Sequence, residues 1–190
     1  MSDSRTRILD AAETLFAETG YEATSPARIA RAADVPKGLV FHYFPQKMDV
    51  LLTLIDERTE IEESPEEPPP ADPAGALRRL ADRLPLRASP SMRRILFREA
   101  DTHRTARDRL TALNHELVHR ARRALELALP GSRGDAARLE VAAATFATVL
   151  LYQENLFHLT GAHIDPGALA DLITRALSLS ICVTSTWRPS

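Results

Sequence analysis

One short segment of the chain has the spacing of a metal-dependent hydrolase motif. Residues 115–119 are His-Glu-Leu-Val-His, and on a helix two histidines four residues apart lie on one face. Two imidazoles placed in this way can bind zinc, with Glu116 beside them as the general base for peptide hydrolysis. A zinc-dependent peptidase that uses His115-Glu116-x-x-His119 is therefore the alternative function that the sequence offers.

The residues after this motif argue against a catalytic site. The continuation RARRALELALP lacks the glycine and third histidine that complete a metzincin site. Arg120, Arg122 and Arg123 would also oppose a bound cation. We therefore expect no catalytic residue, no metal and no cofactor, although zinc bound without catalysis stays an alternative. Both histidines are interpreted as surface or pocket-lining residues of a helix.

A second group of residues suits contact with a phosphate backbone. Ser25 and Pro26 are typical of an N-cap and a first helical position, and the free N–H groups at a helix N-terminus suit an anion. Lys37 and Gly38 open the next short helix. Gly38 leaves one side of that helix bare, so that a DNA backbone could come close.

A series of short helices is predicted around Ser25, Lys37 and Gly38 and would position them. Apolar residues recur at helical spacing over residues 4–19, and Gly20 is a stop signal. The pattern predicts further helices at about 26–33, 36–43 and 46–63, with a tight turn at Asp34-Val35 and a break at Phe44-Pro45. Two short helices joined by a tight turn form a helix-turn-helix, whose second helix can enter a major groove.

Residues 7–47, RILDAAETLFAETGYEATSPARIARAADVPKGLVFHYFPQK, resemble the DNA-binding domain of the TetR family of transcriptional regulators. The similarity includes the aromatic-rich ending FHYF-P-x-K. The resemblance implies a homodimeric repressor whose three-helix N-terminal domain binds a palindromic operator. It also implies a helical C-terminal domain that binds a small ligand and dimerises through its last two long helices.

The resemblance also implies roles for individual residues. Three match positions that touch phosphates near the first motif helix: Thr24, Ser25 and Arg28. Three open the recognition helix, where family members meet base edges: Lys37, Gly38 and Leu39. Three match an aromatic patch that lies against the backbone and thymine methyl groups: Phe41, His42 and Tyr43. Lys47 matches a phosphate-contacting lysine at the start of the fourth helix.

Three positions depart from the family pattern. Asp34 replaces the glycine usual in the turn, and aspartate tolerates a left-handed backbone better than most residues. Pro36 stands where a capping Ser or Thr is common, and Phe41 stands where tyrosine is usual. Operator identity therefore cannot be borrowed from relatives.

Composition and charge limit the other classes of function. The formal net charge is −2, and residues 1–50 hold six Lys or Arg against seven Asp or Glu, so the basic footprint usual in DNA binding is missing. Cations that contact DNA must therefore share one face. A single cysteine, Cys182, excludes an intramolecular disulfide framework. No apolar run could span a membrane and no signal peptide is evident, so we expect a cytoplasmic protein without membrane contact.

The rest of the chain is predicted to be helical. The segment SPEEPPPADP, residues 64–73, cannot continue a helix. We therefore predict a helix-turn-helix DNA-binding domain at 1–47, with a connecting helix at 46–63, and a ligand-binding and dimerisation domain at 64–190. Further helices are expected at about 73–84, 91–101, 106–129, 134–159 and 165–183. The fold class is all-α, with about nine helices.

The C-terminal domain supplies candidate residues for an unknown small-molecule effector and for a homodimer. A helix bundle can enclose a cavity, and the candidate lining residues are Phe97, His103, His119, Phe146, Tyr152, Asn155 and Phe157. The last two helices carry more apolar surface than one subunit would cover, and the candidate dimer residues are Leu156, Leu169, Leu172, Ile173, Leu177 and Ile181. A twofold contact there would place two recognition helices about 34–36 Å apart, which is one turn of DNA.

Overall fold

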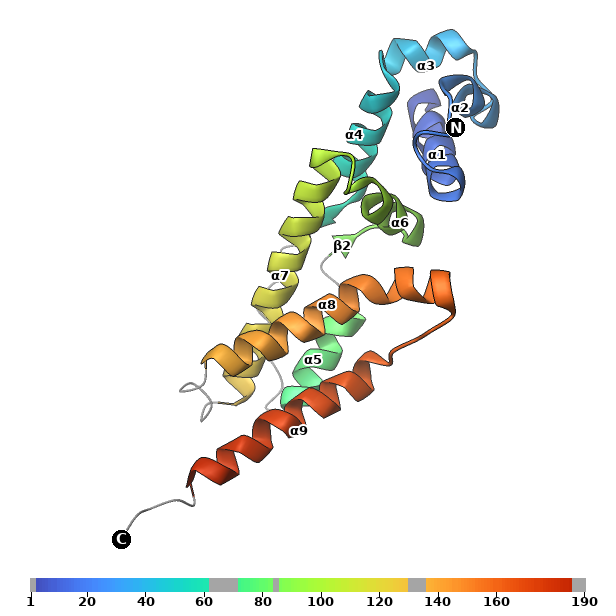
Figure 1. Ribbon diagram of the computed structural model, residues 1–190. Helices are drawn as coiled ribbons and strands as arrows, with labels where there is room; N and C mark the ends of the chain where they lie inside the picture. Colours follow the sequence, from blue (N-terminus) through green and yellow to red (C-terminus); the bar gives the residue numbers. More distant parts are fainter. Residues whose placement is uncertain (1–2, 62–71, 84–85, 130–135, 186–190) are drawn as a thin grey trace. The chain divides into compact units, whose positions relative to one another are not determined.

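The computed structural model describes residues 3–61, 72–83, 86–129 and 136–185. Within these ranges the chain is almost wholly helical, which confirms the predicted all-α class (Figure 1). The helices are α1 (Ser4–Thr19), α2 (Pro26–Ala32), α3 (Lys37–Tyr43), α4 (Lys47–Arg58), α5 (Pro73–Asp82), α6 (Pro90–Glu99), α7 (Arg104–Ala128), α8 (Ala136–Thr160) and α9 (Pro166–Ser185). None of the helices in these ranges is long and apolar enough to cross a membrane.

The chain after α4 differs from the expected helix at 46–63. The helix ends at Arg58, because Thr59 leaves the helical region with a φ of −133° and a ψ of 47°; its hydroxyl donates to the Ile55 carbonyl. Two short antiparallel strands follow, β1 (Glu60–Ile61) and β2 (Leu86–Arg87), with Ile61 opposite Leu86. Strands of two residues carry no alternating pattern, so sequence periodicity could not predict them.

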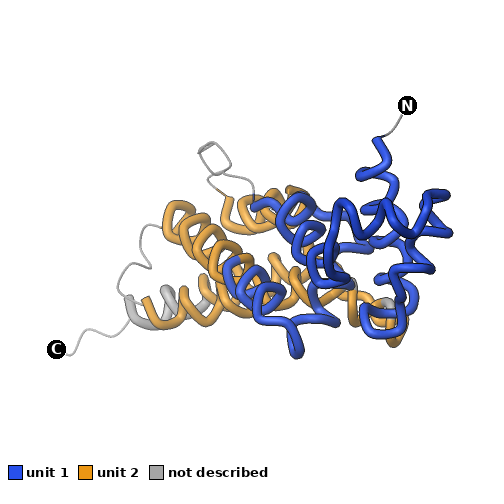
Figure 2. The backbone as a smooth tube through the Cα atoms, turned by 90° about the horizontal axis from the view of Figure 1, so that it is seen from above, with its two compact units in different colours: residues 1–62, 86–112 blue, residues 63–85, 113–190 orange. Residues whose placement is uncertain are grey.

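The chain folds into two compact units that do not follow the chain order (Figure 2). Unit 1 contains residues 1–62 and 86–112, and unit 2 contains residues 63–85 and 113–190. The long helix α7 therefore begins in unit 1 and continues in unit 2.

The core of unit 1 joins the helix-turn-helix to α4 and α6. Helix α1 buries Ile8, Leu9 and Phe16 on one face, and it ends where Gly20 takes a φ of +86° and donates its N–H to the Phe16 carbonyl. The same core contains buried residues of α2, α4 and α6, among them Ile29, Leu51, Leu54, Met92 and Ile95. Because α6 shares this core, unit 1 is larger than the helix-turn-helix alone.

The core of unit 2 lies between α5, the later part of α7, α8 and α9. Its buried residues include Leu77, Leu125, Leu139, Phe146, Ala170 and Ile173. The Asp72 carboxylate caps α5 by accepting from the N–H groups of Ala74 and Gly75. Arg78 on α5 pairs with Asp171 on α9, which joins two helices that also pack through the core.

Candidate nucleic-acid interface

The start of α2 has the geometry that the sequence predicts. The Ser25 hydroxyl accepts from the Arg28 N–H at 3.3 Å, and Pro26 occupies the first turn. The Arg28 guanidinium donates to the Ala23 carbonyl at 3.1 Å, which folds its side chain back over the loop before α2. Ser25 is exposed, so this helix N-terminus is open to an anion from outside.

The turn between α2 and α3 depends on one left-handed residue. Asp34 has a φ of +52°. Among the described residues, every other residue with a positive φ is a glycine. The predicted tolerance of aspartate at this position is therefore confirmed. The Val35 N–H donates to the Ala30 carbonyl at 3.0 Å, which closes the turn and sets the direction of α3.

Arg7 clamps this turn from α1, and sequence reasoning missed it. Its guanidinium donates to the Ala33 carbonyl at 2.5 Å and to the Asp34 carbonyl at 2.6 Å, and lies 3.3 Å from the Asp34 carboxylate. These carbonyls at the end of α2 have no helical partner. A cation near the end of a helix was a possible signal, but nothing local in the sequence pairs residue 7 with residues 33–34.

One face of α3 is buried and the other is open. Val40 on α3 and Phe44, which follows the helix, lie in the core of unit 1. Pro36 precedes the helix and provides no side-chain cap, as its residue type predicts. The exposed residues of α3 are Lys37, Gly38, Phe41, His42 and Tyr43, while Leu39 is half-buried.

Gly38 has space around it that the fold does not use. A Cβ added at this position would meet no atom within 4 Å, and α3 needs no left-handed backbone there. The fold alone therefore does not require glycine at residue 38. A close approach from outside the chain would require it.

The charged and aromatic groups of α3 lie together on its open face. The Lys37 ammonium lies 5.6 Å from the centre of the Phe41 ring, and the His42 and Tyr43 rings meet edge to face at 5.3 Å. Among the residues described, Lys37 takes part in no ion pair. Lys37 thus lies over one exposed ring, and α3 carries two further exposed rings that contact each other.

Thr24 and Lys47 are engaged within the chain. Thr24 is buried, and its hydroxyl donates to the Gly20 carbonyl at 2.8 Å, so it holds the loop between α1 and α2. The Lys47 ammonium donates to the Tyr21 carbonyl at 2.9 Å and lies 4.0 Å from the centre of the Tyr21 ring. An ammonium has three N–H donors, so Lys47 can hold this loop and still reach a phosphate.

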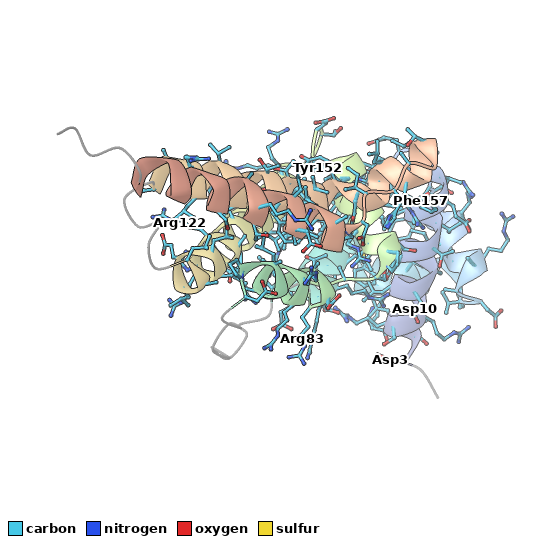
Figure 3. All side chains as sticks on the ribbon, turned by 90° about the horizontal axis from the view of Figure 1, so that it is seen from below. Asp3, Asp10, Arg83, Arg122, Tyr152 and Phe157 are labelled. Carbon is cyan, nitrogen blue, oxygen red and sulfur yellow. The ribbon has the colours of Figure 1, made fainter. Side chains whose placement is uncertain are left out.

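Three acidic residues of the first 50 are engaged by partners within unit 1. Arg58 pairs with Asp10 and with Glu13 (Figure 3 labels Asp10), and the Asp49 carboxylate accepts from the Gln46 N–H at the start of α4. In the opposite sense, Arg5 donates to Glu57, which lies outside this segment, and the bond lowers the pKa of the Glu57 carboxyl. None of these residues belongs to α3, so the formal charge of the segment is not the charge of the open face of α3.

The candidate ligand residues are distributed over both units. Phe97 and His103 belong to unit 1, and the others belong to unit 2. Phe146 is fully buried in the core of unit 2, whereas His119, Tyr152 and Phe157 are exposed and Asn155 is half-buried (Figure 3 labels Tyr152 and Phe157). Their role in binding an effector stays a prediction.

The candidate dimer residues divide into exposed and buried positions. Leu156 and Leu172 are exposed by 40% and 66%, whereas Ile173 and Leu177 are buried in their own chain and Leu169 packs against the same core. The Ile181 side chain lies outside the described residues. The exposed face of α8 also carries Val141, Thr145 and Thr148, which were not predicted and precede the ligand candidate Tyr152 at spacings of three or four; Leu159 is exposed nearer the end of α8.

The His-Glu-x-x-His segment lies on α7 with both histidines exposed. The Glu116 carboxylate accepts from Arg120 at 2.5 Å, so an ion pair holds the group that would act as the general base. Within the part of the chain that the structure describes, no three His, Cys, Asp or Glu side chains gather as a metal site.

Comparison with known proteins agrees with the geometry of unit 1. Residues 8–54 match the family model of bacterial regulatory proteins, tetR family. The HTH-type transcriptional repressor KstR of Rhodococcus jostii (strain RHA1) is 31% identical over 106 residues, which is 52% of this chain and 50% of KstR. The HTH-type transcriptional regulator HbdR of Aromatoleum sp. (strain CIB) is 46% identical over 55 residues, which is 28% of this chain and 24% of HbdR. The matches thus span half or less of these relatives.

The fold of the whole chain is also similar to that of solved regulators. One is a protein of Saccharomonospora viridis, assigned as a transcriptional regulator and solved in complex with choline. It is 15% identical to this chain with a TM-score of 0.62, and the alignment covers 94% of this chain and 97% of that one. At this identity the similarity concerns the fold, not the ligand.

Proposed function

We propose that this chain, whose residues 8–54 match the family model of bacterial regulatory proteins, tetR family, is a ligand-responsive transcriptional repressor of that family. In this proposal it binds a palindromic DNA operator as a homodimer, and a small-molecule effector releases it. The observation that carries the proposal is the open face of α3, where Lys37 and the unoccupied space at Gly38 lie beside exposed aromatic rings. The site of action would be chromosomal DNA in the cytoplasm.

The proposed docking places α3 in the major groove. The open N-terminus of α2 at Ser25 would receive one phosphate, and Lys47 at the start of α4 would receive another. Lys37, Gly38 and Leu39 would meet base edges at the start of α3. Phosphate contacts would then set the register, and α3 would read the sequence.

The proposed dimer uses the exposed apolar residues of the last two helices. Leu156 on α8 and Leu172 on α9 are the predicted residues that are open to a partner, and the newly found α8 positions extend their surface. Burial of such residues against a second copy removes apolar area from water, which favours association. A twofold axis would then present two recognition helices to the two halves of a palindrome.

The proposed response to an effector follows from differential binding. An effector that binds better to the dimer with the wrong spacing of recognition helices lowers DNA affinity without competing for DNA. The choline held by the S. viridis protein is an example of a small molecule bound by this fold.

A hydrolase is not proposed, and one assay separates the two functions. Purified protein would be analysed for zinc and tested for peptide hydrolysis with and without a chelator. The repressor proposal expects no chelator-sensitive hydrolysis. Zinc at one equivalent together with hydrolysis that the chelator abolishes would overturn it.

The two lysines of the interface provide a test of the DNA-binding function. Binding to a labelled random-sequence duplex should weaken as salt rises, and Lys47→Ala should weaken binding to all sequences and lower the salt slope by about one. Lys37→Ala should instead change sequence preference, because its side chain faces base edges. Identical behaviour of the two variants would contradict this division of roles.

A further inference from the structure

The loop between α1 and α2 is held from two sides at Tyr21. On one side the Lys47 ammonium from α4 donates to the Tyr21 carbonyl at 2.9 Å and lies over its ring. On the other side the Tyr21 N–H donates to the Glu99 carboxylate at 3.3 Å, and the Tyr21 ring meets the His103 ring edge to face at 4.9 Å. We call Tyr21, Lys47, Glu99 and His103 the Tyr21 joint; all four belong to unit 1.

Glu99 occupies an unusual position for a carboxylate. It is 5% exposed, and it lies at the C-terminal end of α6, where the helix dipole disfavours negative charge. A buried carboxylate needs a compensating partner. The Tyr21 N–H provides one contact, and this contact joins α6 to the loop before the helix-turn-helix.

His103 is the group that can supply the missing charge. Its Nε2 lies 3.5 Å from the Glu99 carboxylate, yet this buried nitrogen has no hydrogen-bond partner among the described residues. A protonated imidazole would form an ion pair with Glu99, and a neutral imidazole would leave the carboxylate with less compensation. His103 lies just before α7, whose first residues belong to unit 1.

We propose that Glu99 and His103 are positioning residues for the DNA-contacting Lys47: they hold Tyr21, Tyr21 holds the Lys47 ammonium, and the hold is firmest when His103 is protonated. This inference rests on the proposed DNA-binding function and adds a means of regulating it. Loss of the proton from His103 would loosen the contact of Glu99 with Tyr21, and the Lys47 ammonium would then be held less firmly in the position that contacts a phosphate. DNA affinity would therefore depend on pH as well as on an effector.

The other charged groups on the elements around the joint do not supply this pH dependence. These groups are Glu22 in the loop, Asp49 on α4 and Arg107 on α7, and none of them is a histidine. Burial raises the pKa of Tyr21, and the carboxylates of Glu22, Glu99 and Asp49 raise it further, so Tyr21 stays neutral. Histidine is the side chain whose ordinary pKa lies between 5 and 8.

A double-mutant cycle on DNA affinity tests the joint. The probe is a labelled random-sequence duplex at low salt, and unfolding curves verify that each variant is folded. Glu99→Leu should weaken DNA binding about fivefold in the otherwise unchanged protein. In a Lys47→Ala background the same change should weaken binding by less than about twofold, because Glu99 acts on DNA affinity through Tyr21 and Lys47 and the Lys47 contact is already lost. Glu99→Gln keeps an acceptor for the Tyr21 N–H and should restore most of the affinity.

The pH arm separates positioning from general stability. Raising the pH from 6 to 8 should weaken binding more in the unchanged protein than in His103→Phe, which keeps a ring against Tyr21; His42 is present in both and its effect cancels. Asp101→Asn, which changes an exposed carboxylate between α6 and α7, is the matched control and should behave as the unchanged protein.

Equal losses of DNA affinity from Glu99→Leu in both backgrounds, or a pH profile of His103→Phe identical to that of the unchanged protein, would overturn the joint. Absence of any DNA binding by the unchanged protein would instead overturn the proposed function and the joint with it.

Discussion

At the scale of single residues, function and stability place opposite demands on α3. Gly38 is neither left-handed nor crowded, and a helix of seven residues would gain stability from a better helix former there. Glycine at this position weakens the helix and leaves room for a second molecule. The residues around it include exposed rings and a cation, and exposed apolar groups that gather in this way indicate contact with a second molecule.

Gly38→Ala should therefore separate folding from binding. The free energy of unfolding should stay constant or rise by up to about 1 kcal/mol, because alanine is the better helix former. DNA affinity should fall by about tenfold, which is a loss of about 1.4 kcal/mol of binding free energy. Urea unfolding and binding to a labelled duplex measure the two quantities. Affinity that survives the added methyl group would show that nothing approaches this side of α3.

Asp34 provides a second test at the residue scale. Its φ of +52° should make Asp34→Val unfavourable by about 1–2 kcal/mol, because a branched Cβ fits poorly in the left-handed region. Asp34→Gly should be close to neutral, since relief of the left-handed strain offsets the loss of the exposed contact with Arg7 and the larger entropy of the unfolded chain. Urea unfolding of the three proteins measures this order. A valine variant as stable as the glycine variant would contradict the left-handed turn.

At the scale of elements, local signals were sufficient for helices and insufficient for their contacts. Gly20, Ser25 and Pro26 determine where α1 ends and α2 begins, and each acts through its own backbone or its nearest neighbours. The β1–β2 ladder, the Arg7 clamp and the buried Glu99 depend on residues far away in the chain. Nothing in the sequence around these residues encodes their distant partners, so pattern reading missed them.

Arg7 shows how one side chain can hold two elements. Arg7→Met keeps the aliphatic stem but removes the bonds to the Ala33 and Asp34 carbonyls, so the free energy of unfolding should fall by about 1–2 kcal/mol. Arg31→Met, which removes an exposed cation of α2, is the control and should change stability by less than about 0.5 kcal/mol. Urea unfolding measures both. Equal effects would mean that the clamp contributes nothing beyond charge.

At the scale of the whole molecule, the two units divide the proposed work. Unit 1 carries the surface proposed to face DNA, and unit 2 carries the exposed apolar residues of α8 and α9. The sequence predicted that the last two helices carry an apolar excess. It could not separate residues that face a partner from residues such as Ile173 and Leu177, because both kinds share one apolar stripe.

Leu172→Arg should therefore break the dimer without unfolding the chain. Leu172 is 66% exposed, so a charge there costs little in the monomer but is buried without a partner in the dimer. Light scattering should report a monomeric mass for this variant and a dimeric mass for the unchanged protein. Leu127→Arg, at an exposed position on α7, should leave the dimer intact. A dimeric Leu172→Arg protein would exclude this part of α9 from the interface.

A binding-site selection from a random DNA library with the purified protein tests the central claim most directly. The account predicts enrichment of a palindrome whose half-sites lie about one helical turn apart, since two recognition helices related by a twofold axis read both halves. The same selection with Gly38→Ala should enrich this palindrome weakly or not at all. Failure of the unchanged protein to enrich any sequence would contradict the account.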